Sequence, residues 1–181
     1  MRLILVRHGE TVENAQGIIQ GHLPGKLSEK GRVQAEKIAE KLNEERLDTI
    51  YSSDLARASD TAMRIAEQHP GTPLHLTEDL RERNLGEMQG KRKDEIDFRM
   101  VEGNPVYPPL KEGESLQELY ERAKNFLEKI MEKHAGKDST ILLVSHSDTL
   151  KAVSCAIEGK GPEGIIHHED FPNTGVREFK V

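Results

Sequence analysis

The chain has 181 residues, 35% of them hydrophobic and 32% charged, and its formal net charge is −6 at pH 7. That length suits one domain with a sizeable core, which we expect to span residues 1–181. The acidic balance disfavours a general nucleic-acid binder, because such a protein needs a basic surface to displace the counterions of phosphate. A binding site for an anionic ligand must therefore be built locally.

The sequence also limits where the protein works. Cys155 is the only cysteine, so neither an intrachain disulfide nor a cysteine-based metal cluster can form. The apolar run at residues 3–6 is shorter than the roughly 7–15 residues of a signal-peptide core, and no stretch reaches the roughly 18 residues of a membrane span. We therefore expect a cytoplasmic protein that binds neither membrane nor nucleic acid. A homodimer is one option that the sequence leaves open.

In chain order, short apolar segments alternate with helical patterns. The segments that predict strands lie at residues 3–6, 49–51 and 140–145, with an edge strand within 174–181. Apolar residues spaced three and four apart predict helices at residues 28–42, 55–66, 115–131 and 150–157, the first and third with serine N-caps. The two strongest strand segments are continuously apolar, as in strands covered on both faces. The pattern predicts an α/β fold, a three-layer α/β/α sandwich with a mostly parallel sheet.

Two stretches rich in glycine and proline interrupt this pattern, at residues 84–113 and 159–174. Long irregular loops in a compact domain are usually functional or disordered. We expect a short helix within residues 94–101. We interpret the polar run 167–170 as a solvated loop rather than a metal site, because no other ligands of diagnostic spacing accompany its histidines.

Polar and cationic residues follow three of the predicted strands. Arg7 and His8 follow the first, Arg57 comes soon after the second, and His146 follows the third. Ligands of open α/β sheets bind beyond the carboxyl ends of the strands, so we expect these groups to meet at one edge. Gly9 would let the backbone approach a ligand closely. Each residue alone would be ordinary, but together they indicate an anionic ligand.

Four segments carry a resemblance to a known family. They are LVRHGET at residues 5–11, SSDLARA at 52–58, LRERNLG at 80–86 and VSH at 144–146. In this order they resemble the histidine phosphatase superfamily, the phosphoglycerate mutase-like proteins, over nearly the whole chain. The resemblance implies a single histidine phosphatase domain with the phosphoglycerate mutase-like fold, and a metal-independent reaction without a cofactor.

The resemblance also implies roles for single residues. His8 would be the nucleophile that takes phosphate as a phosphohistidine, and Glu82 would protonate the leaving oxygen. The residues expected to bind phosphate or substrate are Arg7, Arg57, His146, Asn14 and Ser147. The residues considered for specificity are Gln20, Gly21, Lys91 and Arg92.

The chain departs from the family pattern after His146, where Ser147 and Asp148 stand in place of the usual glycines. We expect Asp148 to cap the helix that follows, whose free N–H groups would face the anion. The alternative is that the charge of Asp148 raises the protonated fraction of His146.

We predict a phosphomonoesterase that hydrolyses a small phosphorylated metabolite. The interval between Glu82 and His146 is short compared with that of the glycolytic mutases of the family, and Leu85 stands where the mutase-like pattern has a tyrosine. A cofactor-dependent phosphoglycerate mutase is the enzymatic alternative. A phospholigand-binding protein without turnover is the alternative from another class.

Overall fold

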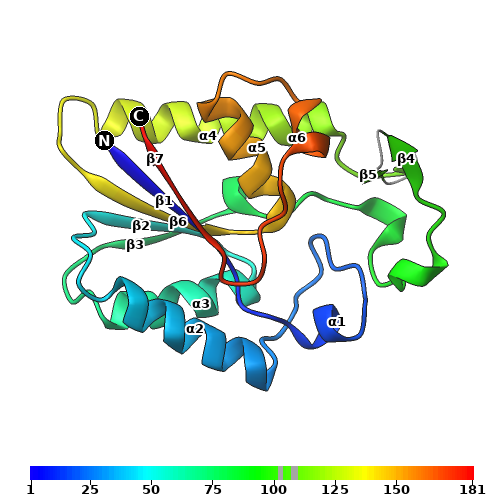
Figure 1. Cartoon of the computed structure of the whole chain (residues 1–181), viewed down its shortest axis with the longest axis horizontal. Coiled ribbons are helices and arrows are strands. Elements are labelled where there is room, and N and C mark those ends of the chain that lie inside the picture. The colour runs from blue at the N-terminus through cyan, green and yellow to red at the C-terminus, as the bar shows by residue number, and fades with distance from the viewer. Residues whose placement is uncertain (102–103, 107–109) are drawn as a thin grey trace.

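The computed structural model describes residues 1–101, 104–106 and 110–181, with side chains given outside residues 99–109. The main sheet has five strands in the order β3-β2-β6-β1-β7 (Figure 1). Their bounds are β1 (Arg2–Arg7), β2 (Thr49–Ser53), β3 (Leu74–Thr77), β6 (Thr140–Ser145) and β7 (Val176–Lys180). Neighbouring strands are parallel except β7, which is antiparallel to β1. The predicted α/β fold with a mostly parallel sheet is confirmed.

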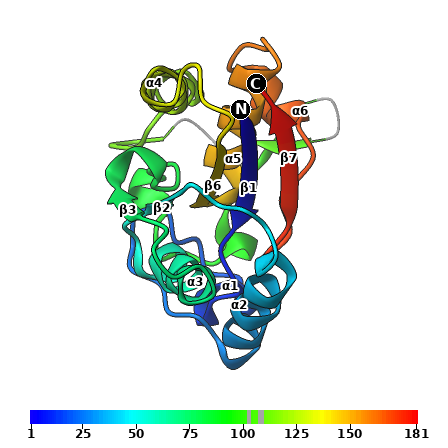
Figure 2. The ribbon, with the colours of Figure 1, turned by 90° about the vertical axis from the view of Figure 1, so that its left-hand side faces the viewer.

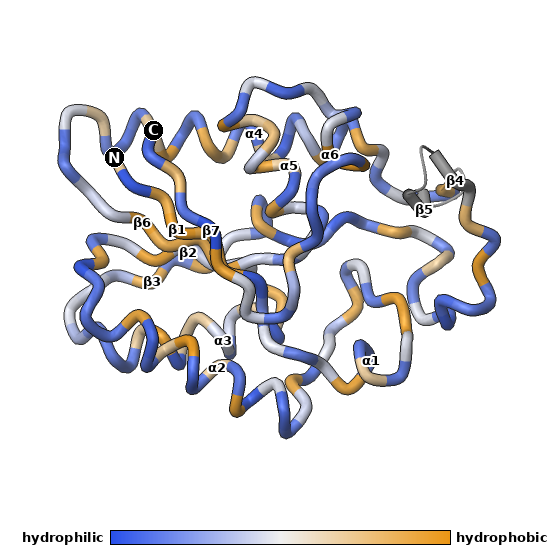
Figure 3. Tube along the Cα trace, viewed as in Figure 1, coloured by the Kyte–Doolittle hydropathy of each residue, from blue (hydrophilic) through white to orange (hydrophobic). Residues whose placement is uncertain are grey.

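Helices cover both faces of the sheet, α4 and α5 on one and α2 and α3 on the other (Figures 1 and 2). Their bounds are α2 (Glu29–Leu42), α3 (Ala56–Glu67), α4 (Leu116–Lys133) and α5 (Ser147–Ile157). Successive side chains of a strand point to opposite faces, so β6 serves both cores. Ile141 and Leu143 pack towards α4 and α5, whereas Leu142 and Val144 pack towards α2 and α3. This double coverage explains the continuous apolar run, which Figure 3 shows where β1 and β6 lie side by side.

The two predicted serine caps are confirmed. Ser28 Oγ accepts a hydrogen bond from the Gly31 N–H group at 3.0 Å and begins α2. Ser115 Oγ accepts from the Glu118 N–H group at 3.1 Å, and the Glu118 carboxylate accepts from the Ser115 N–H group at 2.8 Å, so α4 begins with a capping box. No helix in the described part of the chain is long and apolar enough to cross a membrane.

Several short elements lie outside the predicted pattern. They are α1 (Val12–Ala15), α6 (Gly164–His167) and the 3₁₀ turns η1 (Glu78–Leu80), η2 (Gly86–Met88) and η3 (Lys93–Glu95). The short helix expected within residues 94–101 is wrong. There η3 ends at Ile96, whose backbone is extended, and the chain continues into β4 (Arg99–Val101), which pairs with β5 (Asn104–Val106). Gly103, Pro108 and Pro109 of the irregular stretch lie outside the described residues.

Candidate active site

The carboxyl ends of β1 and β6 bring two histidines together. The strands are parallel neighbours, and Arg7 pairs in register with Ser145. His8 directly follows β1 and His146 directly follows β6, and their ring centroids lie 5.0 Å apart. Both side chains are buried, His146 completely. The predicted meeting of these strand ends is therefore confirmed.

The backbone of Gly9 selects the tautomer of His8. His8 Nδ1 lies 2.7 Å from Gly9 O. A carbonyl oxygen can only accept, so the proton resides on Nδ1 and the free lone pair on Nε2. Burial lowers the pKa of His8 well below its ordinary value, and the nearby charges of Arg7 and Arg57 lower it further. His8 is thus a neutral imidazole whose Nε2 is available as a nucleophile at neutral pH.

Gly9 makes a different close approach from the one expected. A Cβ at Gly9 would lie 2.5 Å from Gly31 O, and a Cβ at Gly31 would overlap Glu10 O. The two glycines let the chain after β1 pack directly on the first turn of α2. The Gly9 N–H group also donates to Thr61 Oγ1 of α3 at 3.1 Å. The tight contact of Gly9 with Gly31 therefore joins two parts of the protein.

Two arginines lie beside His8 and hold loop carbonyls. Arg57 is 1% exposed, and its Nη1 and Nη2 donate to Leu23 O at 2.9 Å and to Gly21 O at 2.7 Å. Arg7 Nη1 donates to Phe171 O at 2.6 Å. Burial lowers the pKa of Arg57 to about 10, so this group stays cationic at neutral pH. The Nε atoms of both arginines are buried without a hydrogen-bond partner among the described residues, which leaves donors for an anion.

His146 lies behind His8 and does not line the cavity in front of it. His146 Nε2 is 2.9 Å from Ser53 Oγ, a hydroxyl that also accepts the Leu55 N–H group at 3.2 Å. His146 Nδ1 is buried without a partner among the described residues. Burial and the charge of Arg57 lower the pKa of His146 well below its ordinary value. His146 is therefore a neutral imidazole at neutral pH.

Glu82 supplies the acidic group of the site. Its Oε1 accepts from the Arg83 N–H group at 3.0 Å and lies 3.4 Å from Thr149 N, in the first turn of α5. Burial raises the pKa of Glu82, and the charge of Asp148 raises it further. Glu82 is thus more readily protonated than an ordinary glutamate, as a general acid at neutral pH requires.

The expected capping role of Asp148 is wrong. The N-cap of α5 is His146, which makes no side-chain capping bond, and Asp148 lies inside the first turn. A cap must precede the helix, and this helix already begins at Ser147. The charge of Asp148 acts on the protonation of Glu82 and does not raise the pKa of His146.

The site opens into a cavity of about 440 Å³. The predicted residues that line it are Arg7, His8, Asn14, Gln20, Gly21, Arg57, Glu82 and Ser147. Lys91 and Arg92, considered for specificity, do not line it. Arg92 turns its Nε to Asp94 Oδ1 at 3.0 Å, and Lys93 lines the cavity instead. Sequence reasoning also missed Lys151 and Asp170, which form an ion pair at the cavity.

Comparisons with known proteins agree with this geometry. Residues 3–181 match the model of the histidine phosphatase superfamily, branch 1. The chain belongs to the histidine phosphatase superfamily.

Among the known proteins similar to the chain, some are named phosphatases and others are named mutases. A metal-independent phosphoserine phosphatase of Arabidopsis thaliana is 39% identical over 98% of the chain and 77% of its own length. A 2,3-bisphosphoglycerate-dependent phosphoglycerate mutase of Bartonella henselae is 34% identical over 92% of the chain and 86% of its own length. The crystal structure of a phosphoserine phosphatase from Entamoeba histolytica in complex with 3-phosphoglyceric acid superposes with a TM-score of 0.82, at 28% identity, over 99% of the chain and 90% of its own.

In this histidine phosphatase, the segment before β7 closes one side of the site. Phe171 O binds Arg7, and Asn173 Nδ2 donates to His8 O at 3.1 Å. Asp170, in the same segment, pairs with Lys151 of α5. Residues 170–173, which are far from His8 in the sequence, thus hold Arg7, the His8 backbone and Lys151 in place.

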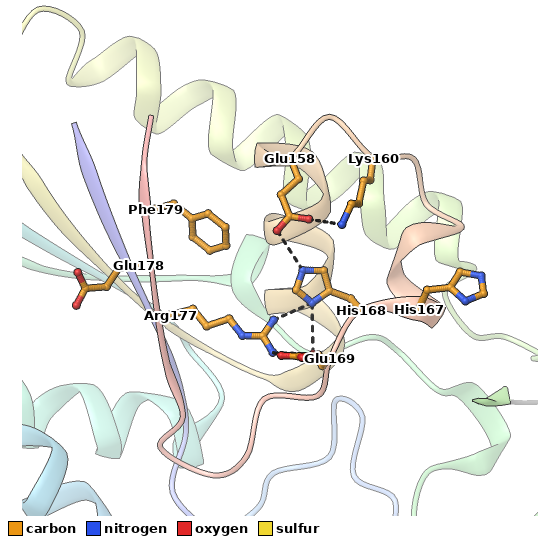
Figure 4. A pocket seen from close by; sticks show the side chains of 8 residues that line it. All are labelled: Glu158, Lys160, His167, His168, Glu169, Arg177, Glu178 and Phe179. Carbon is orange, nitrogen blue, oxygen red and sulfur yellow. Dashed lines mark hydrogen bonds and ion pairs between the residues drawn. The ribbon is translucent and has the colours of Figure 1, made fainter. Parts of the chain in front are cut away.

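His168 anchors that segment (Figure 4). Arg177 Nη1 of β7 donates to His168 Nδ1 at 2.8 Å, and His168 Nε2 lies 3.6 Å from Glu158 Oε1. The His168 side chain is 8% exposed, so the expectation of a solvated loop at residues 167–170 is wrong at this position. Within residues 1–101, 104–106 and 110–181, no three histidine, cysteine or acidic side chains are grouped so as to hold a metal ion.

Proposed function

We propose that this histidine phosphatase is a phosphomonoesterase that hydrolyses a small phosphorylated metabolite through a phosphohistidine on His8. The observation that carries the proposal is the neutral His8, whose Nδ1 is bonded to Gly9 O at 2.7 Å and whose Nε2 has no hydrogen-bond partner among the described residues. Arg7 and the buried Arg57 beside it, with a Glu82 of raised pKa on the same cavity, supply the other groups that phosphate transfer needs. The phosphatase names of relatives support the proposal.

The reaction has two half-reactions. His8 Nε2 forms a bond to phosphorus while the bond from phosphorus to the alcohol oxygen breaks, and Glu82 gives its proton to that oxygen. Glu82, now a carboxylate, then takes a proton from a water whose oxygen attacks phosphorus. The bond between nitrogen and phosphorus breaks, inorganic phosphate leaves, and Glu82 is protonated again.

Charge on the transferring phosphoryl group is balanced by protein donors. We assign this role to Arg7 and Arg57, whose Nε donors are buried without a partner among the described residues, and to His146, whose Nδ1 is likewise buried without one. A charge-assisted hydrogen bond of this kind is worth about 1.5–3 kcal/mol. Asn14 and Ser147 line the cavity and would contact the same oxygens or the substrate beyond them.

The two lysines that line the cavity suit a substrate with a second anionic group. Lys93 and Lys151 line it, and the Lys151 side chain is 11% exposed. Its partner Asp170 is 83% exposed, so a substrate carboxylate could take the place of the Asp170 carboxylate at little cost. Gln20 and Gly21 border the same space. The 3-phosphoglyceric acid bound to the Entamoeba relative is a compound of this class.

A phosphoglycerate mutase is the second candidate, favoured by the similarity to the Bartonella mutase. A mutase must keep water from the phosphoenzyme, whereas a phosphatase must admit it. The two activities therefore differ in where the phosphoryl group ends.

One experiment tests both candidates and the binding protein without turnover. The purified protein is incubated with phosphoserine, with 3-phosphoglycerate plus 2,3-bisphosphoglycerate, and with a wider set of phosphometabolites, and free phosphate and isomers are measured. We expect release of phosphate by the wild type and none by His8→Ala. Rapid isomerisation with little free phosphate would establish the mutase, and equal inactivity of both proteins on every substrate would leave only ligand binding.

The assembly and the compartment of the protein are also proposals. We infer a cytoplasmic enzyme, and a homodimer is one possible oligomer. Light scattering of the purified protein and fractionation of cells that express it would test the two.

A further inference from the structure

Glu82 occupies a part of the chain that has no regular structure of its own. It lies in residues 81–84, called here the Glu82 segment, between the 3₁₀ turns η1 and η2. No ladder of backbone hydrogen bonds fixes this segment, in contrast to the strand end that carries His8. Other groups must therefore hold the Glu82 carboxylate where a leaving oxygen arrives.

Arg122 of α4 binds the backbone that leads into Glu82. Its Nη1 donates to Asp79 O at 2.7 Å and to Arg81 O at 2.9 Å, and its Nη2 lies 3.4 Å from Glu82 O. A planar guanidinium presents its donors in a fixed arrangement, so these carbonyls are held relative to one another as well as to α4.

Glu114 binds both Arg122 and the backbone that leaves the Glu82 segment, and the pair Arg122 and Glu114 is called here the clamp. Its two carboxylate oxygens accept from Arg122 Nε at 2.8 Å and Nη2 at 2.7 Å. The backbone that leaves the Glu82 segment is bound as well, since the Glu114 N–H group donates to Asn84 O at 2.7 Å and Glu114 O accepts from Arg83 Nε at 2.7 Å. The side chains of Glu114 and Arg122 are 14% and 20% exposed, so this paired geometry is shielded from water.

The clamp lies away from the reacting atoms. Glu114 and Arg122 line a separate hollow of about 430 Å³ and not the cavity that contains His8. On the cavity side, Thr149 Oγ1 donates to Arg81 O at 2.7 Å. The Glu82 segment is thus held between Arg122 on one side and α5 on the other.

We propose that Arg122, oriented by Glu114, is the positioning residue for the general acid Glu82, and that it acts on catalysis through the place and angle of that carboxylate. The inference rests on the proposed phosphatase function. It predicts a chemical selectivity, because a misplaced acid harms only those reactions whose leaving oxygen needs a proton. An alkyl phosphate such as phosphoserine has such a leaving group, whereas the nitrophenolate of 4-nitrophenyl phosphate leaves without help.

The test compares kcat/KM for these two substrates, because this constant reports the transfer of phosphate to His8 whatever the rate of the second half-reaction. For Arg122→Gln we expect a loss of about 100-fold with phosphoserine and of less than about threefold with 4-nitrophenyl phosphate. Arg122→Lys should recover part of the loss, and Glu114→Gln should show the same selectivity to a smaller degree. Lys129→Gln is the matched control, since Lys129 lies on the same helix, is 69% exposed and reaches only the Asp79 carboxylate at 3.6 Å.

A double variant separates positioning from a general structural role. If Arg122 acts through Glu82, then Glu82→Gln with Arg122→Gln should be no slower on phosphoserine than Glu82→Gln alone, within about twofold. Equal losses with both substrates, or additive losses in the double variant, would overturn the inference while the phosphatase function stands. If Arg122→Gln does not fold, the isosteric Glu114→Gln gives the same comparison. An inactive wild type would overturn both proposals together.

Discussion

The proposed nucleophile and the proposed acid of this site are held by different kinds of structure. The strand-end frame consists of Arg7, which ends β1, and of His8 and His146, which directly follow β1 and β6. The backbone hydrogen bonds of these two neighbouring strands set their positions. The Glu82 segment is held by side chains instead, chiefly Arg122, Glu114 and Thr149. Backbone ladders do not depend on which side chains are present, whereas the second kind of support does. We therefore expect substitutions of nearby side chains to change the position of Glu82 more easily than that of His8.

The largest effect should come from Arg57, which joins the strand-end frame to the loop over it. Arg57→Ala removes a cation that we propose to bind phosphate, and it frees Gly21 O and Leu23 O. We expect kcat/KM to fall about 10³-fold, because the loss of one donor to a transferring group costs about 10²–10³ and the loop adds to it. Arg64→Ala is the control on the same helix, since Arg64 is 50% exposed and pairs only with Glu67. A loss below tenfold for Arg57→Ala would show that the frame binds phosphate without it.

Glu82→Gln should have the next largest effect. A glutamine keeps the shape of Glu82 but cannot give a proton, so we expect a loss of about 10²–10³ in kcat/KM with phosphoserine and a small one with 4-nitrophenyl phosphate. Glu78→Gln, at a side chain that is 75% exposed, is the control. If Glu82→Gln slowed both substrates equally, its role would be in binding rather than in proton transfer.

The free energy of unfolding should depend on pH because burial lowers the pKa of several histidines. Burial lowers the pKa of each histidine in the set His8, His22, His69, His134 and His146. Below a pH of about 6.5 the unfolded chain takes up protons at these rings that the folded chain refuses, so the free energy of unfolding falls as the pH falls. Each ring contributes up to about 1.4 kcal/mol per pH unit until its own folded pKa is reached.

Denaturant titrations between pH 7.5 and 5.5 would measure this slope. The raised pKa of Glu82 acts in the opposite direction, because its folded form binds a proton before its unfolded form does. The double variant His8→Gln with His146→Gln should therefore flatten the slope, and Glu82→Gln should steepen it. A free energy of unfolding that stays constant over this range in both the wild type and Glu82→Gln would contradict the buried neutral state of His8 and His146.

Asp148→Asn should give the smallest effect. The charge of Asp148 helps to raise the pKa of Glu82, so its removal lowers that pKa. Glu82 must be protonated to act as the acid, and the alkaline limb of the kcat/KM profile should therefore move to lower pH, with less than about a tenfold change at the optimum. Asp170→Asn removes a carboxylate that also lines the cavity but does not contribute to the shift of Glu82, and it should leave that limb in place.

The strand-end frame could be predicted from sequence because its signals are local. Continuous apolar runs mark β1 and β6, and the residues after them must lie at the carboxyl edge of a parallel sheet. β3 lacked such a signal, since it is an edge strand whose Leu76 is 53% exposed. The motif around Glu82 was found only through the family resemblance, and its support by Arg122 depends on contacts some 40 positions apart in the chain.

Some further residues at the cavity could have been predicted from the sequence, and others could not. Lys151 lies four residues after Ser147 on α5, so both occupy one face of that helix, and this spacing could have predicted Lys151 at the site. Asp170 and Phe171 come from an irregular segment without periodicity, and sequence alone offers no means to place them. The charge of Asp148 was noticed, but its target depends on the packing of the Glu82 segment against α5, which is a tertiary property.

The register of β1 and β6 has a consequence for how such a protein can diverge. His8 and His146 directly follow an in-register pair of residues, so the 5.0 Å between their rings repeats the spacing of roughly 4.7–4.9 Å between hydrogen-bonded strands. The pairing of the two strands therefore sets the distance between the two imidazole rings. Insertions, deletions and exchanges in the loops above can then change which molecule enters without altering that distance, so new substrates can be acquired while the reacting geometry is inherited intact.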